Sequence, residues 1–169
     1  MTSSQALVFR TIELPRNADT TVEFRRDSYV CSFGSDDAFG GRETYLGWLA
    51  DRIARHPAGH VHVWNGDTII GQIEMHLRPD RPDQGYINLF YLVPSHRGHG
   101  LGGALHAYAL DFMRVRYARR VTLSVSTTNE RALAYYLKHG WRDRGPQHPD
   151  RSVHLLELSL SDTGQQQAP

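Results

Sequence analysis

A glycine-rich segment whose residue types suit anion binding lies past the middle of the chain. Residues 96–103 read HRGHGLGG; an apolar, β-branched segment precedes them at 86–93, and apolar residues at helical spacing follow from 101 to 112. This order predicts a strand, a glycine turn and a helix. The first N–H groups of a helix lack intrahelical partners and carry partial positive charge, and glycine lets an anion approach them. The turn therefore predicts a phosphate-binding site.

Three classes of phosphate site compete for this turn. Gly98, Gly100 and Gly103 match the G-x-G-x-x-G pattern of dinucleotide folds, but no acidic residue lies between positions 112 and 129 to hold a ribose. An oxidoreductase is therefore a distant alternative. A nucleoside-triphosphate loop needs Gly-Lys-Ser/Thr, and the chain's lysine is Lys138, far downstream. That class is excluded.

The third pattern occurs together with a second motif downstream. Arg97, Gly100 and Gly102 form Arg-x-x-Gly-x-Gly after a segment that ends in Leu-Val-Pro, and residues 129–141 read NERALAYYLKHGW, which is Asn-x-x-Ala-x-x-x-Tyr-x-x-x-Gly followed by an aromatic residue. In both motifs the chain resembles the GNAT superfamily of acetyl-CoA-dependent N-acetyltransferases, over roughly residues 5–160. Trp141 replaces the usual Phe. The resemblance implies transfer of an acetyl group to a primary amine by direct attack in a ternary complex.

The resemblance also implies acetyl-CoA as co-substrate and indicates which residues bind it. The amides of the turn would hold the diphosphate, and the preceding strand would contact the pantetheine arm through its backbone. Asn129 suits a helix N-cap equally well. The expected cofactor-binding residues are Phe90, Tyr91, Leu92, Arg97, Gly98, His99, Gly100, Leu101, Gly102, Gly103, Asn129 and Tyr136.

Tyr136 is the candidate general acid at the matched family position. A phenol with a pKa of about 10 can protonate a departing thiolate whose pKa is about 8.5. Tyr135 is the alternative if the helical register differs by one residue. A buried aromatic side chain without a catalytic role is the other interpretation of Tyr136.

The general base is harder to assign, because Asn88 and Ser124 occupy positions where the family often carries Glu. Glu74 is the nominated base; Gln72 and His76 flank it at the two-residue spacing of one strand face. A solvated or hydrogen-bonded strand residue is the alternative. His76 is the second candidate, since an ordinary pKa near 6.5 suits proton transfer. A lysine acceptor, with a pKa of about 10.4, needs a base more than an α-amine of about 8.

The elements that must position these residues alternate along the chain as in an α/β (α+β) fold. The resemblance implies a mixed, mostly antiparallel sheet of about seven strands, flanked by about four helices, with a V-shaped splay between the central parallel strands. Residues 78–84 are expected to form a proline-rich turn. Expected strands are 7–14, 60–64, 68–77, 86–93, 119–126, 141–144 and 152–160; expected helices are 20–33, one ending at Pro57, 101–117 and 129–139.

Composition favours one soluble domain over residues 1–160, with a disordered tail at 161–169. The 169 residues are 40% hydrophobic with a net charge of +1, which argues against nucleic acid as a partner. No apolar run approaches the roughly 18–20 residues of a membrane span. The N-terminus lacks a signal-peptide pattern, so a cytoplasmic location is expected.

The remaining residues have plain interpretations. His60 and His62 are expected to be exposed strand residues rather than metal ligands, and Cys31 a buried helix residue. The acceptor, a small-molecule or peptide amine, would meet loops 34–41 and 143–151. In the first loop, Asp36 and Asp37 could attract a cationic amine or simply be solvated. Dimers are common in the family, so a homodimer is one expectation. A catalytically silent acyl-CoA-binding module is the alternative function.

Overall fold

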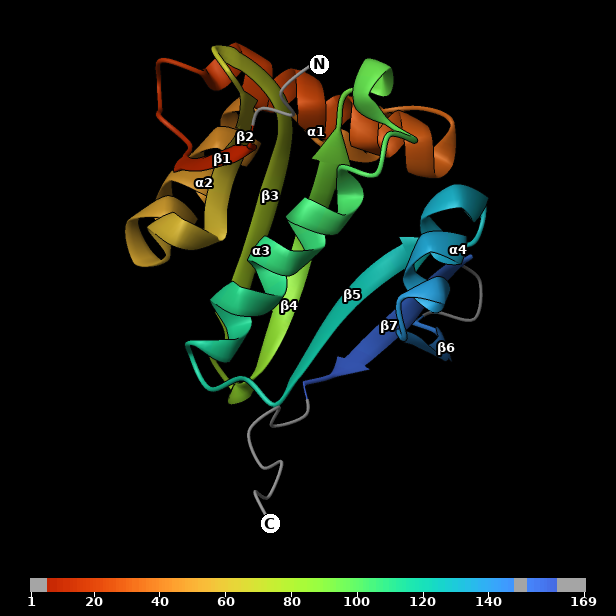
Figure 1. Ribbon diagram of the computed structural model, residues 1–169. Coiled ribbons are helices and arrows are strands. Elements are labelled where there is room, and N and C mark those ends of the chain that lie inside the picture. The colour runs from red at the N-terminus through yellow and green to blue at the C-terminus, as the bar shows by residue number, and fades with distance from the viewer. Residues whose placement is uncertain (1–5, 148–151, 161–169) are drawn as a thin grey trace, which may run out of the picture.

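The computed structural model describes residues 6–147 and 152–160, which form one sheet with helices on both faces (Figure 1). Its seven strands run in the order β1-β2-β3-β4-β5-β7-β6, and all neighbours are antiparallel except β4 and β5. The expected mixed sheet with four helices is confirmed. The strands are β1 Val8–Thr11, β2 His60–Asn65, β3 Thr68–Arg78, β4 Arg81–Leu92, β5 Arg120–Ser126, β6 Arg142–Pro146 and β7 Val153–Ser159; the helices are α1 Ala18–Phe33, α2 Arg42–Arg55, α3 Gly102–Arg114 and α4 Glu130–Lys138.

The two parallel strands diverge toward their C-terminal ends. Pairing between β4 and β5 runs only from Gln84 with Arg120 to Ile87 with Leu123, although both strands continue. Figure 1 shows the resulting V, with the glycine turn beyond the end of β4 and α4 beside the end of β5. The predicted splay is therefore confirmed.

A bulge in β4 lies where the strands separate. Glu74 of β3 pairs with Leu89, and the next residue, Met75, pairs with Ile87, so Asn88 is an extra residue in β4. A bulge of this kind bends its strand and increases the local twist. It therefore directs the end of β4 away from β5.

The two faces of the sheet differ in character. The face under α3 and α4 carries a large apolar core that includes Ile73, Met75, Met113 and Leu156. The face under α1 and α2 has smaller apolar clusters, and between them it buries a row of polar strand residues, His60, His62, Gln72, Glu74 and His76. Buried polar groups need partners, so this face is where a site with side-chain chemistry is expected.

Two boundary predictions were wrong. The expected turn at 78–84 is confined to residues 79–80, because β3 runs to Arg78 and β4 begins at Arg81. Pro82 lies before the first residue paired with β5, so its missing N–H costs no bond to that strand. Helix α3 ends at Arg114 rather than near Tyr117, which has a φ of 62° that a helix cannot continue. The expected tail at 161–169 lies outside the described residues.

Candidate active site

The glycine turn between β4 and α3 has an open face. Gly98 and Gly100 both have a φ of 78°, a left-handed conformation that favours glycine. A Cβ added at Gly100 or Gly103 would meet no atom within 4 Å. In the described part of the chain, no N–H of residues 98–101 donates to a backbone carbonyl. Free amides at the start of α3 and space in front of them fit a bound diphosphate.

The Arg97 side chain ties this turn to α1. Its Nη2 donates to Asp27 Oδ2 at 3.0 Å and its Nε donates to the Leu92 carbonyl at 2.7 Å. Tyr91 completes the contact, because its hydroxyl donates to the same Asp27 oxygen at 2.6 Å and its ring lies 5.3 Å below the Arg97 guanidinium. Although Arg97 was expected among the cofactor-binding residues, its guanidinium is thus engaged in holding the turn in place.

Beyond the bulge, β4 presents backbone groups to the gap between β4 and β5. A Cβ on Gly71 of β3 would clash with the Tyr91 carbonyl oxygen, so that carbonyl faces β3. Because backbone direction alternates along a strand, the N–H and C=O of Phe90 and Leu92 face the gap. The Leu92 carbonyl already accepts from Arg97. Among the three expected strand residues, Phe90 therefore offers the freest backbone pair.

Tyr136 on α4 lies across the gap from this backbone. Its ring stacks with Phe90 at 6.3 Å between centroids and meets Trp141 edge-on at 5.5 Å. Burial, and then the neighbouring Tyr135, raise the pKa of Tyr136 above its ordinary value, so the phenol carries its proton at neutral pH. Tyr135 instead faces Gly102 of α3. The register therefore directs Tyr136, and not Tyr135, at the gap.

Asn129 acts as a helix cap in this structure. Its side-chain oxygen accepts a hydrogen bond from the Ala132 N–H at 3.3 Å at the start of α4. This contact accounts for the Asn without a ligand. Its expected cofactor contact stays a prediction.

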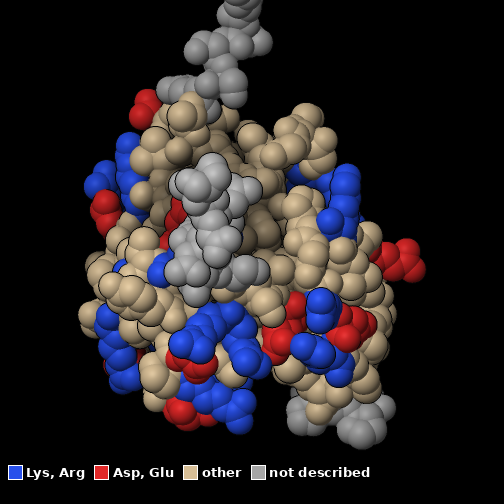
Figure 2. Space-filling model, turned by 60° about the horizontal axis from the view of Figure 1, so that its bottom comes forward, with Lys and Arg blue, Asp and Glu red and all other residues tan. Residues whose placement is uncertain are grey.

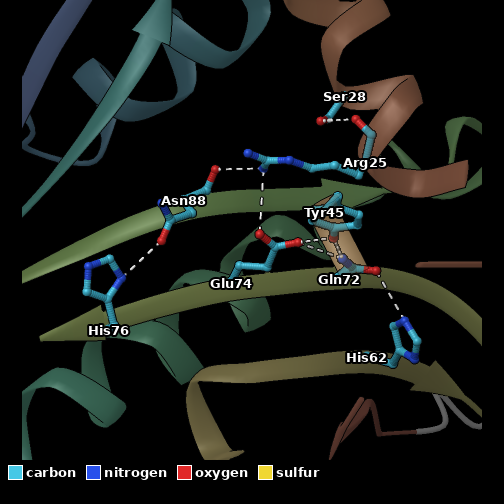
Figure 3. Close-up of polar contacts among 8 residues, drawn as sticks. All are labelled: Arg25, Ser28, Tyr45, His62, Gln72, Glu74, His76 and Asn88. Carbon is cyan, nitrogen blue, oxygen red and sulfur yellow. Dashed lines mark hydrogen bonds and ion pairs between the residues drawn. The ribbon is translucent and has the colours of Figure 1, made fainter. Parts of the chain in front are cut away.

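Glu74 is the centre of a buried polar network on the opposite face (Figure 3). Its side chain has no exposed surface; Oε1 accepts from the Tyr45 hydroxyl and, at 2.8 Å, from Gln72 Nε2. Oε2 lies 3.7 Å from Nη1 of Arg25, which also donates to the Asn88 carbonyl at 3.1 Å. Glu74 thus holds the Arg25 guanidinium against the bulge of β4.

The charges of this pair support each other. Burial is the largest effect on Arg25 and opposes its charged form, but Glu74, Tyr45 and Tyr29 together outweigh burial, so the pKa of Arg25 is raised. Burial and then the Glu74 charge raise the pKa of Tyr45, which keeps its phenol protonated as a donor. Because Glu74 is enclosed by these partners, an acceptor amine has no direct access to its carboxylate in this conformation. Glu74 is therefore a buried, hydrogen-bonded residue rather than a solvated one, and its nominated role as general base stays a prediction.

His76 is the more accessible of the two candidate bases, with 8% of its surface exposed. Its Nδ1 lies 3.0 Å from Asn88 Oδ1, and since that oxygen accepts, Nδ1 carries the proton and Nε2 keeps its lone pair. Burial and then the charge of Arg52 lower the pKa of His76 to about 4. The imidazole is therefore neutral at pH 7 and only weakly basic.

Uncharged polar groups bridge the β5 side of this face. The Tyr86 hydroxyl lies 2.8 Å from Ser124 Oγ, and the serine hydroxyl reaches Gln147 Oε1 at 2.9 Å. These residues come from β4, β5 and the end of β6, so they span the two sides of the gap. Ser124, which stands where the family often carries Glu, is thus part of a hydroxyl chain.

The acidic residues of the two loops lie at or near the surface and have polar partners. Asp36 pairs with Arg26 at 3.8 Å, and Asp37 accepts from Ser35 at 2.9 Å. Asp143 lies 2.7 Å from His154, and hydrogen bonds from His154 and then from the Gly145 N–H lower the pKa of Asp143. Residues 148–151 of the second expected loop lie outside the described residues.

The structure also bears on the expectations for the two strand histidines, the cysteine and metal binding. His60 and His62 are fully buried rather than exposed, because α1 and α2 cover that face of the sheet. Cys31 is exposed rather than buried; its sulfur lies 3.4 Å from Nη1 of Arg97. Within residues 6–147 and 152–160, no three His, Cys, Asp or Glu side chains are grouped so as to hold a metal ion.

The charged surface is mixed. On the face drawn in Figure 2, blue and red side chains lie next to one another rather than forming a field of one sign. Among the described helices, none is both long and apolar enough to cross a membrane.

Comparison with known proteins finds a family model and relatives that are similar in sequence. The model of the acetyltransferase (GNAT) family matches residues 22–141. The chain is 30% identical over 115 residues to mycothiol acetyltransferase of Corynebacterium glutamicum, a match covering 63% of this chain and 38% of that protein. It therefore spans well under half the length of that relative. It is also 33% identical over 58 residues to N-alpha-acetyltransferase 30 of Schizosaccharomyces pombe, covering 34% of this chain and 39% of that protein.

Solved structures share the whole fold. PaiA N-acetyltransferase from Thermoplasma acidophilum, in complex with coenzyme A, superposes with a TM-score of 0.74 at 17% identity, covering 92% of this chain and 99% of that one. Spermidine N-acetyltransferase from Vibrio cholerae, in complex with CoA and spermine, gives 0.72 at 17% identity, covering 93% and 96%. At these identities the likeness shows the fold, while the family model covers most of the chain. The chain therefore belongs to the GNAT acetyltransferase family.

Proposed function

We propose that the chain transfers an acetyl group from acetyl-CoA to a primary amine of a small molecule or peptide, by direct attack in a ternary complex. The observation that carries this proposal is the arrangement along one gap. The open amides of the glycine turn, the free backbone of Phe90 and the phenol of Tyr136 all face the space where β4 and β5 separate. Such a gap fits a long ligand with an anionic end.

The residues have separate parts in the proposed reaction. Acetyl-CoA supplies a thioester, whose C–S bond breaks as the amine nitrogen forms an amide bond. The turn would hold the diphosphate, and Phe90 would pair with the amides of the pantetheine arm. Tyr136 would donate its proton to the departing sulfur and recover one from solvent. The amine would bind in its neutral form, and the proton it loses on forming the amide would pass to solvent water.

The weak bases at the site favour an acceptor of low pKa. Glu74 is enclosed, and His76 with a pKa of about 4 gives little help in deprotonating an ammonium group. At pH 7 an α-amine with a pKa of about 8 is roughly one-tenth neutral, whereas a lysine amine is less than about one-thousandth neutral. We therefore propose an α-amine, or another amine of similar pKa, as the acceptor. The name of the fission-yeast relative, an N-alpha-acetyltransferase, supports this class.

One observation favours a second candidate function. With Asn88 and Ser124 in place of carboxylates and Glu74 enclosed, the chain could bind acyl-CoA without turning it over. Such a protein would sense or regulate rather than catalyse.

Two measurements on the wild-type protein separate these functions. Acetyl-CoA should raise the melting temperature, because a ligand that binds only the native state stabilises it. Release of free CoA thiol should follow when α-amines are added, and less when only lysine amines are added. A thermal shift without thiol release from any amine in the panel would favour the silent module. A shift with reduced nicotinamide nucleotides and none with acetyl-CoA would contradict both.

A further inference from the structure

Two side chains of α4 lie against the glycine turn. Arg131 and Tyr135 are separated by four positions, so they share one face of the helix. Nη2 of Arg131 lies 3.0 Å from the position a Cβ on Gly98 would take. The Tyr135 ring lies 3.4 Å, and its hydroxyl 3.6 Å, from the corresponding position on Gly102. This face of α4 therefore flanks the turn at both of its ends.

The Arg131 guanidinium carries an unneutralised charge at this place. Its side chain is exposed, and no carboxylate of residues 6–147 or 152–160 lies within 4 Å of it. The contrast is Arg97, whose charge is matched by Asp27. A planar guanidinium matches the geometry of phosphate oxygens and can donate two parallel hydrogen bonds. Beside open backbone amides, it adds a cation to a site already suited to an anion.

The Tyr135 hydroxyl is an unused donor next to the first turn of α3. The oxygen is buried and has no hydrogen-bond partner among the described residues. Burial raises the pKa of Tyr135, so the hydroxyl keeps its proton. A buried donor without a partner is costly in a folded protein. An anionic oxygen held at the turn is the acceptor that would satisfy it once α4 and the turn adjust to the ligand.

We propose that Arg131 and Tyr135 bind the diphosphate of acetyl-CoA from the α4 side of the glycine turn. This inference rests on the proposed function, because it concerns the same donor site. It adds a consequence for the mechanism: α4 also carries Tyr136, so binding of the diphosphate would hold the phenol in place over the gap. Recognition of the donor and protonation of its sulfur would then depend on one helix.

The test is the affinity of purified protein for CoA, measured by calorimetry, for two variants and a control. Arg131→Gln should weaken binding about tenfold, since it removes a charge-assisted contact, and Tyr135→Phe about threefold. Arg114→Gln removes an exposed arginine at the opposite end of α3, away from the turn, and should leave the affinity unchanged. Equal affinities for wild type and Arg131→Gln would overturn the proposal.

Two further measurements show which phosphate of CoA Arg131 contacts and whether Tyr135 only contributes to packing. With 3′-dephospho-CoA, the loss for Arg131→Gln should be as large as with CoA; if the loss disappears, the 3′-phosphate is the partner and the diphosphate assignment is wrong. Tyr135→Phe should keep or raise the melting temperature of the free protein while weakening CoA binding. A lower melting temperature with unchanged affinity would mean that Tyr135 only packs. If wild type does not bind CoA, the proposed function itself fails.

Discussion

The two sides of the gap are built in different ways. On the donor side, the glycine turn comes from a few consecutive residues, and its working groups are backbone amides. On the proposed acceptor side, Glu74 of β3 meets Arg25 of α1 and Tyr45 of α2, and the polar groups are buried side chains. Anion binding by the glycine turn requires that side chains be absent. The stability of the buried Glu74 network requires that every partner be present.

This difference has a consequence for variants. A change in the turn should affect binding of acetyl-CoA and leave the fold largely intact, because the turn is exposed and packs against little. A change in the network should affect stability, because it leaves a charge or donor buried without a partner. The following variants test whether the two sides separate in this way.

The largest effect is expected for Gly100→Val. A β-branched residue is strained at a φ of 78°, and its side chain would stand in the open space in front of the amides. The KM for acetyl-CoA should rise at least about 1,000-fold, which corresponds to roughly 4 kcal/mol of lost binding free energy. Steady-state kinetics measure it, with Gly47→Ala as the control, since Gly47 lies in α2 with open space around it. A variant with wild-type KM would refute the role of the turn.

Glu74→Gln is expected to lower the free energy of unfolding by about 3 kcal/mol, because breaking one partner of a buried ion pair leaves the other uncompensated. The new amide N–H₂ would also face the Arg25 guanidinium, which lies 3.7 Å from Oε2. Urea unfolding measures the effect. The double variant Arg25→Gln/Glu74→Gln should recover part of the loss. Equal stability of wild type and Glu74→Gln would show that the network contributes nothing.

Tyr136→Phe removes the proton donor and keeps the ring that packs on Phe90. The kcat should fall about 100-fold with little change in the KM for acetyl-CoA, as expected when a general acid is lost. Rapid-quench or steady-state thiol release measures it. Tyr135→Phe is the comparison in the neighbouring position, and it should affect donor affinity more than kcat. A kcat for Tyr136→Phe near that of wild type would assign the acid elsewhere.

A smaller effect is the pH dependence of stability. Burial lowers the pKa of His62 to about 4, against a Gln72 hydrogen bond that raises it. The unfolded chain therefore binds more protons between about pH 6.5 and 4, so stability falls as the pH drops through this window. His62 alone should remove about 2 kcal/mol between pH 7 and pH 5.

Unfolding of His62→Gln at the two pH values checks this effect. The variant should lose less stability on acidification than wild type, whereas His99→Gln, at an exposed position of the turn, should keep the wild-type slope. Identical slopes for wild type and His62→Gln would contradict a buried neutral imidazole.

The strand, glycine turn and helix were predictable from sequence because their signals are local: they lie within about thirty residues. Tyr136 was nominated from the matched family motif, and its role stays a prediction. The mixed sheet and its splay came from the family resemblance rather than from periodicity. At the glycine turn itself, nothing in the sequence indicated that the Arg97 side chain would bind Asp27, seventy positions away.

The acceptor side was only partly predictable. Alternation along β3 placed Gln72, Glu74 and His76 on one face, but nothing local indicated that α1 and α2 would cover that face. For the same reason His60 and His62 were wrongly expected to be exposed. Arg25 and Tyr45 carried no signal as site residues, because each lies within a helix and meets Glu74 only through tertiary contact.

The most direct test of the separation between the two sides is calorimetric titration of acetyl-CoA into three proteins: wild type, Gly100→Val and Glu74→Gln. We expect binding at one site per chain in wild type, no measurable binding in Gly100→Val, and an affinity within about threefold of wild type in Glu74→Gln. Loss of binding in folded Glu74→Gln, or binding retained in Gly100→Val, would contradict a donor site formed by the glycine turn and independent of the buried network.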